Sequence, residues 1–309
     1  MSIDRATLPG AGAPKITWNG GEFWTADDVA IPIQHALVEQ RSSMYGRVTK
    51  TLGGRMIEIS VPLFGLWANI ARLFPASILN PTIGSRVFTG ADLPMVLHAK
   101  NGDRLTIHNV HLTKVADLKL AANQRIFSAN AVFTGLLKNN ADPEDANSYF
   151  TYDTAAYSEG SFAMTTFKAR TWTGAWGALT GFTSILTEAG WDVSWEITME
   201  PDVVDGLGVV DMFLTHFWGS ASCIPVGPTA AQIEAQQKFQ GAGAGIGADA
   251  ATTSDLVLTD GTNSVTLKSA TLTSTGLVFA PNKKRIGPTS WECTRGFSAG
   301  TPQALATTA

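Results

Sequence analysis

Three histidines close together in the chain are the residues whose type could bind a metal ion. They are His98, His108 and His111. On a regular strand, residues three apart point to opposite faces, so His108 and His111 meet only if the strand is irregular. We therefore interpret them as separate strand histidines and predict no metal site.

Two further patterns could indicate catalysis or cofactor binding. Gly243, Gly245 and Ala248 match GxGxxA, but a dinucleotide site needs a strand before the glycines and a helix after them. Here a Gln-rich stretch precedes and a Thr/Ser/Asp stretch follows, which favours a flexible loop. Glu196 and Glu200 share a strand face, as paired acids do, but no histidine or activated nucleophile accompanies them. HExxH, P-loop and CxxC motifs are absent from the sequence. We expect no enzymatic activity and no cofactor.

Composition describes a globular, β-rich chain. Its 309 residues suffice for two domains, and it is 44% hydrophobic and 16% charged. Its net charge of −4 and pI of about 5.7 argue against a protein built to grip nucleic acid. Its two cysteines are too few for a disulfide framework. The first residues lack the apolar run of a signal peptide, and no apolar run is long enough to cross a membrane. We expect a soluble, cytosolically made subunit.

One segment of the sequence occurs twice in similar form. Residues 105–126 read LTIHNVHLTKVADLKLAANQRI, and residues 265–286 read VTLKSATLTSTGLVFAPNKKRI. The spacing is 160 positions (266 − 106), and a one-residue slip aligns Leu118 with Leu277. Both copies change their hydrophobic phase at the same place, as one extra strand residue would cause. We predict the same β-bulge near residues 108–109 and 268–269.

The match extends upstream and predicts a tandem duplication. EISVP from Glu58 resembles EITMEP from Glu196, and each is followed by apolar residues at helical spacing. These residues are Leu63, Trp67, Ile70 and Phe74 in the first half, and Val203, Leu207, Val210 and Leu214 in the second. The sequence predicts domains at residues 1–140 and 141–309, joined within 138–147. The second carries an inserted Gly/Ala-rich loop at about 229–253.

The segment WDVSWEITME, residues 191–200, alternates apolar and polar residues without a break. Such a period of two predicts a strand with one buried and one wet face. The polar positions that we single out are Glu58 and Ser60 in the first half, and Asp192, Ser194, Glu196, Thr198 and Glu200 in the second. They form either an ordinary sheet surface or a wall facing an enclosed aqueous space.

Two tandem strand–helix–strand units with these EISVP, EITMEP and bulged strands resemble phage tail tube proteins. The likeness is to the major tail proteins of long, non-contractile-tailed phages. It implies a mainly β fold, a β-sandwich or barrel with one flanking α-helix, duplicated as two tail-tube-like domains. Family members assemble rings of six domains that stack into a tube, so two domains per chain imply homotrimeric, pseudo-hexameric rings.

The resemblance implies a structural virion protein of the phage tail, assembled in the host cytoplasm, whose tube conducts DNA during ejection. The lumen then holds the tape-measure protein and DNA without specific binding, and tail-terminator and distal-tail proteins meet the tube ends. Because lysine and arginine bind phosphate strongly, an acidic lumen lets DNA slide. The polar positions named above are the lumen-facing candidates. Residues 20–40 and 229–253 are the candidate loops that reach adjacent rings.

Two alternatives stay open. A tail-completion or distal-tail ring protein of the same fold stops at single rings instead of forming long polymers. A β-sandwich carbohydrate-binding module uses exposed tryptophans as stacking platforms, for which Trp18, Trp24, Trp172 and Trp176 are the candidates. We favour core or interface packing for these four rings.

Overall fold

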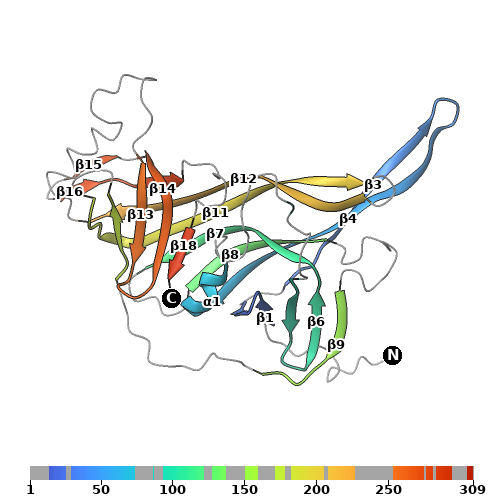
Figure 1. The fold of residues 1–309 in the computed structure, drawn as a ribbon, viewed down its shortest axis with the longest axis horizontal. Helices are drawn as coiled ribbons and strands as arrows, with labels where there is room; N and C mark the ends of the chain where they lie inside the picture. Colours follow the sequence, from blue (N-terminus) through green and yellow to red (C-terminus); the bar gives the residue numbers. More distant parts are fainter. Residues whose placement is uncertain are drawn as a thin grey trace.

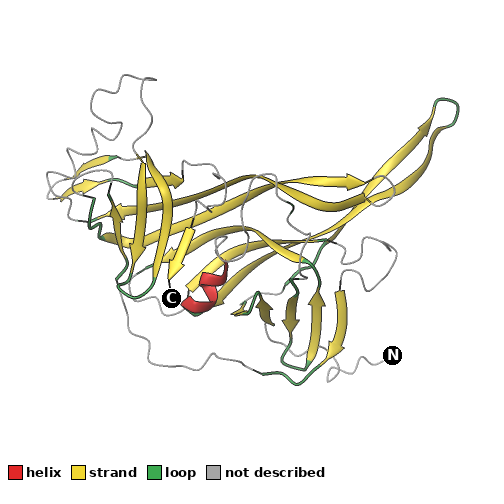
Figure 2. Ribbon diagram, in the orientation of Figure 1, coloured by secondary structure: helices red, strands yellow, loops and turns green. Residues whose placement is uncertain are grey.

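The described residues fold almost entirely into β-strands, with one short helix among them (Figure 2). The computed structural model describes residues 14–25, 29–73, 86, 93–121, 127–136, 150–158, 171–177, 182–204, 208–226, 253–274, 276–280, 283–293 and 305–308. The helical segment is α1 (Trp67–Ile70), continued by the 3-10 turn η1 (Ala71–Leu73). The predicted mainly β class is confirmed.

The first half of the chain contains strands β1 to β9. They are β1 (Lys15–Trp18), β2 (Gly21–Trp24), β3 (Ile33–Ser42), β4 (Gly46–Gly65), β5 (Met95–His98), β6 (Asp103–Ile107), β7 (Val110–Leu120), β8 (Phe127–Gly135) and β9 (Phe150–Thr154). The second half contains β10 (Thr173–Trp176), β11 (Thr187–Val204), β12 (Gly208–Pro225), β13 (Thr253–Thr259), β14 (Ser264–Ser274), β15 (Leu277–Ala280), β16 (Lys283–Ile286), β17 (Thr289–Cys293) and β18 (Leu305–Thr308).

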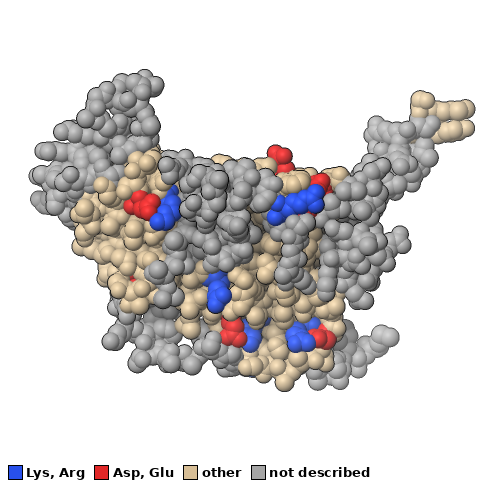
Figure 3. All heavy atoms as spheres, viewed as in Figure 1, with Lys and Arg blue, Asp and Glu red and all other residues tan. Residues whose placement is uncertain are grey.

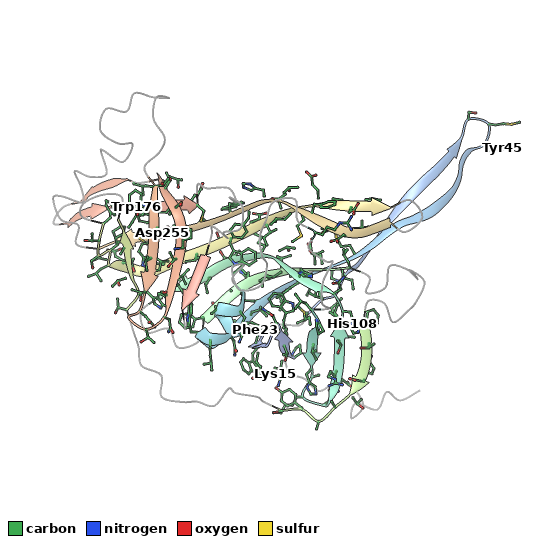
Figure 4. The ribbon with its side chains drawn as sticks, viewed as in Figure 1. Lys15, Phe23, Tyr45, His108, Trp176 and Asp255 are labelled. Carbon is green, nitrogen blue, oxygen red and sulfur yellow. The ribbon has the colours of Figure 1, made fainter. Side chains whose placement is uncertain are left out.

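One antiparallel sheet of 16 strands runs through both halves. Its order is β10-β13-β14-β17-β12-β11-β7-β8-β4-β2-β1-β5-β6-β9, with β18 on β14 and β3 on β4, while β15 and β16 form a separate pair. The halves meet where β11 pairs with β7. The long hairpins β3–β4 and β11–β12 extend to the same side of the molecule (Figure 1), and Tyr45 lies exposed at the far tip of the first (Figure 4).

Among the described residues, the main hydrophobic core lies on one side of this sheet. Alternation places Trp191, Val193 and Trp195 of β11 in it, all at most 1% exposed. The helix contributes Trp67, whose ring centroid lies 5.2 Å from that of Phe127 and 5.0 Å from that of Trp172, in the second half. Aromatic contacts therefore join the two halves beside the β7–β11 pairing.

The predicted bulge is present in both copies, at equivalent residues. Asn109 has a φ of 52° and Ser269 a φ of 49°, in the left-handed region that non-glycine residues rarely adopt. In the second copy, Lys268 and Ser269 lie between two ladder pairs opposite one residue, Asp255. The Asp255 carboxylate accepts hydrogen bonds from the Ser269 backbone N–H at 2.9 Å and from the Lys268 ammonium at 2.7 Å. The Asp255 side chain therefore stabilises the bulge of the second copy.

The first copy builds its bulge in the same way. Met95 lies opposite Ile107, and the Val110 backbone N–H donates to the Leu93 carbonyl at 3.0 Å. Between these two pairs, residues 108 and 109 lie opposite the single residue 94, which is the pattern of a β-bulge. The phase change in the sequence predicted this irregularity correctly.

The predicted second helix is wrong within the described residues. Val203 lies in β11, and Val210 and Leu214 lie in β12, so their spacing of three or four residues spans a hairpin instead of a helical turn. In the first half, Trp67 and Ile70 do lie in α1, and Leu63 is still in β4. Leu207 and Phe74 fall outside the described residues.

The match between EISVP and EITMEP also gives the wrong strand equivalence. Ile59 of β4 lies opposite Phe133 of β8, and Ala221 of β12 lies opposite Trp291 of β17. By pairing, β4 therefore corresponds to β12, and β3 to β11. Alternating polar and apolar residues made two non-equivalent strands look alike.

The proposed joint between the domains and the inserted loop fall on residues that are not described. These are 138–147 and, apart from Thr253 in β13, 229–253. Strand β9, which follows the predicted joint, pairs with β6 of the first half.

Candidate functional site

The polar positions singled out in the sequence lie on one continuous sheet surface, here called the polar face. It crosses the adjacent strands β12, β11, β7, β8 and β4. One row of directly opposed residues across these strands is Trp218, Glu196, Lys114, Val132 and Ser60. Opposed residues in an antiparallel sheet share a face, so the candidates on β4 and β11 lie on the same side.

The exposure of the seven candidates fits a wet face. Five of them are exposed, namely Glu58, Ser60, Asp192, Thr198 and Glu200, and two are half-buried, namely Ser194 and Glu196. The intervening residues Ile57, Ile59, Val193, Trp195 and Ile197 are at most 6% exposed and face the core on the other side of the sheet.

Lysines on β7 lie among the carboxylates of the polar face. The Lys114 ammonium is 3.5 Å from Glu196 Oε2, and the Lys119 ammonium is 3.7 Å from Asp192 Oδ1. Sequence reasoning missed both lysines, because nothing local indicates that β7 is the neighbour of β11. Lys114 and Lys119 are five residues apart, so a strict period of two would have placed them on opposite faces of β7. The register shift between the Leu118–Val193 and Val115–Trp195 pairs brings both to the side of the acids.

Acidic groups still outnumber basic ones among the charged residues identified on this surface. The acidic residues are Glu58, Asp117, Asp192, Glu196, Glu200 and Glu292, and the basic ones are Lys114 and Lys119. In the view of Figure 3, acidic and basic side chains likewise lie side by side in small groups. The arrangement offers a wet surface of mixed but net negative charge.

The histidines are held by separate local contacts. His98 is buried, with Nε2 3.1 Å from the Ala155 carbonyl oxygen, and His108 Nε2 lies 3.4 Å from Thr151 Oγ1. His111 is buried on β7. Within the described ranges, no group of three His, Cys, Asp or Glu side chains is arranged to hold a metal ion. The Gly243–Ala248 pattern lies outside those ranges.

Three of the four candidate stacking tryptophans belong to the core. Trp18 and Trp176 are 0% exposed and Trp172 is 2% exposed, whereas Trp24 is half-buried. A ring buried in the core cannot stack on a sugar. The packing interpretation is therefore correct for these three residues.

The two thiols are poor nucleophiles. Burial raises the pKa of Cys293 to about 12, and burial together with nearby Asp192 raises the pKa of Cys223 further above its ordinary value. Because the thiolate is the reactive form, neither residue is activated at neutral pH.

Comparison with known proteins gives no assignment. No protein-family model matches the chain, and no curated protein is significantly similar to it. Among the described residues, the structure has no helix both long and apolar enough to cross a membrane.

Proposed function

We propose that this chain is the tube-forming subunit of a phage tail, with two tandem tail-tube-like domains of β-sandwich or barrel type. Three chains form a pseudo-hexameric ring, and stacked rings form the conduit for DNA ejection. The observation that carries the proposal is one strand arrangement occurring twice in the chain, joined into a sheet whose free face is polar.

The two halves repeat individual hydrogen bonds as well as strand order. The Trp18 indole N–H donates to the Val110 carbonyl at 3.0 Å, and the Trp176 indole N–H donates to the Ala270 carbonyl at 3.0 Å. Both acceptors directly follow the left-handed residue of the bulge. Such a specific device, present twice at the same place, supports duplication of a whole domain.

A second hydrogen bond is repeated three residues further along β7 and β14. The Thr113 hydroxyl donates to the Val132 carbonyl at 3.0 Å, and the Thr273 hydroxyl donates to the Ser290 carbonyl at 3.2 Å. In both copies the strand register shifts at that threonine.

The paired halves supply a repeating unit of four strands. The first half contributes β3-β4-β8-β7, and the second contributes β11-β12-β17-β14, in the same order. Joined through β7 and β11, they make one sheet with the core on one side and the polar face on the other. A sheet with one covered and one wet face suits the wall of a water-filled channel.

Strand geometry gives a channel of useful width. Three chains of this kind supply about 24 strands, which at ~4.8 Å spacing and ~40° tilt close into a barrel roughly 50 Å across between backbones. Inward side chains reduce this to about 40 Å, which still admits double-stranded DNA. The net acidic polar face would repel phosphate and leave DNA free to slide, as well as the tape-measure protein before it.

Electron microscopy of the purified protein tests the proposal. Negative-stain images should show long hollow tubes whose end-on averages have threefold symmetry with six similar lobes. Isolated closed rings would instead support the alternative of a tail-completion or distal-tail protein, whose rings would show the same lobes but would not stack into a tube. A protein that stays monomeric at high concentration would refute both assignments.

A further inference from the structure

The outer edge of β3 is the edge that faces away from its hairpin partner β4. Among the described strands, β3 pairs with β4 alone. The corresponding hairpin β11–β12 differs, because the outer edge of β11 pairs with β7 of the first half. The β7–β11 pairing is therefore an example, within the chain, of a strand pairing that β3 could make with another chain.

The internal junction has a defined antiparallel register. Leu120 lies opposite Trp191, Lys119 opposite Asp192, and Leu118 opposite Val193. The register then shifts, and Ser194 has no β7 residue opposite it in the described ladder.

Pairing within the hairpins transfers this register to the first half. In the first hairpin Ile33 lies opposite Ile57, and in the second Trp195 lies opposite Gly219. Both the first and the second members of these pairs are 162 positions apart (195 − 33 and 219 − 57), so the two hairpins correspond at that spacing. Residues 29–31 then take the places of residues 191–193.

The burial of the first-half segment agrees with this correspondence. Val29 and Ile31 pack partly buried against the core, whereas Ala30 is exposed. Pro32 takes the place of Ser194, the position without a β7 residue opposite it. Proline cannot donate a backbone N–H, so it is tolerated where the ladder is interrupted.

The matching edge lies in the second half, on β15. Leu277–Ala280 corresponds to residues 118–121 by sequence (277 − 118 = 159), of which 118–120 form the end of β7. In the second half the corresponding segment is a strand of its own, which follows β14 in the chain. On one side β15 pairs with β16. No pairing of its other edge occurs among the described strands.

We propose that residues 29–31 of one chain pair antiparallel with residues 277–279 of β15 of the next chain, with Ala30 opposite Val278. This inference rests on the proposed function and names the contact that would close its ring. The contact joins two different surfaces, so it is head-to-tail and forms a ring when the rotation closes. In this register Ala30 and Val278 take the place of the charged pair Asp192 and Lys119 at the internal junction.

Cysteine cross-linking of the assembled protein tests this register, in a Cys223→Ala, Cys293→Ala background. Oxidised Ala30→Cys/Val278→Cys protein should migrate as covalent dimers and trimers under denaturing, non-reducing conditions. The off-register pair Ala30→Cys/Ala280→Cys should stay monomeric, since diagonal Cβ atoms lie ~7–8 Å apart and a disulfide needs ~4 Å.

An internal control shows whether this position permits a disulfide. Lys119→Cys/Asp192→Cys should form the equivalent bond within one chain, detected by mass after alkylation. If this bond forms and tubes are visible, but Ala30→Cys/Val278→Cys stays monomeric, the proposed pairing is refuted while the tube assignment survives. If the parent protein forms neither rings nor tubes, the proposed function itself fails.

Discussion

Reversing charge on the polar face gives the sharpest test of a channel wall. The change is Glu196→Lys with Glu200→Lys, both on β11. Each replacement turns −1 into +1, so the chain moves from a net charge of −4 to about 0. If the polar face lines the lumen, every ring of three chains gains six ammonium groups pointing at the DNA.

The fold should tolerate this change. The lost ion pair joins Lys114 and Glu196 at 3.5 Å, with side chains 43% and 38% exposed. Pairs this exposed contribute about 0–1 kcal/mol because water screens them. Glu200 is exposed, so no charge becomes buried. The new ammonium at position 196 lies directly opposite Lys114, and such a like-charge pair costs up to about 1 kcal/mol more. The free energy of unfolding should fall by no more than about 2 kcal/mol, and tubes should still form.

DNA transit should respond much more strongly. Each phosphate contact steepens the dependence of log K on log salt by about 0.9, so six contacts change affinity by about 10³-fold between 50 and 200 mM salt. We expect virions with the altered wall to release DNA far more slowly than the parent at 50 mM salt. The rate should recover towards that of the parent at 200 mM, measured by fluorescence of a DNA-binding dye after triggering ejection.

A matched control separates wall charge from total charge. Asp103→Lys with Asp153→Lys makes the same total change on β6 and β9, away from the polar face, and also breaks an exposed ion pair, that of Arg104 and Asp153. These virions should eject at the parental rate at both salt concentrations. Parental ejection by the Glu196→Lys/Glu200→Lys virions at 50 mM would show that the polar face is not the wall. Failure of their tubes to assemble would identify it as an interface.

Three further predictions concern the core. Trp18→Phe removes the indole hydrogen bond to the carbonyl at the first bulge, and should lower the free energy of unfolding by about 1–3 kcal/mol in a urea titration, because a buried acceptor loses its donor. Gly174→Ala places a Cβ 2.2 Å from the Trp191 ring, and should lower the melting temperature through a cost of about 1–3 kcal/mol or more; an unchanged melting temperature would contradict the packing described. Cys223 is buried and Cys293 partly buried, and both have raised pKa values, about 12 for Cys293, so both stay protonated at pH 8 and native protein should resist iodoacetamide until urea unfolds it; rapid labelling of native protein would contradict the raised pKa values.

Some features follow from the sequence because they depend on neighbours along the chain. The unbroken alternation of residues 191–200 sets which side chains of β11 face the core, since a strand has a period of two. The shared phase change of the repeated segment located both bulges, which an extra residue must produce. The polar candidates were therefore placed on a wet face correctly.

Strand neighbours depended on the tertiary structure instead. The pairing of β11 with β7 brings Lys114 and Lys119 among the carboxylates, although 82 residues separate Lys114 from Glu196. No local pattern encodes such a contact, because the choice of partner is made by packing of the whole core and by the closure of long loops. The same limit explains the false equivalence of β4 with β11 and the false second helix. Local periodicity determines the face that a residue occupies, and only long-range packing determines what lies opposite it.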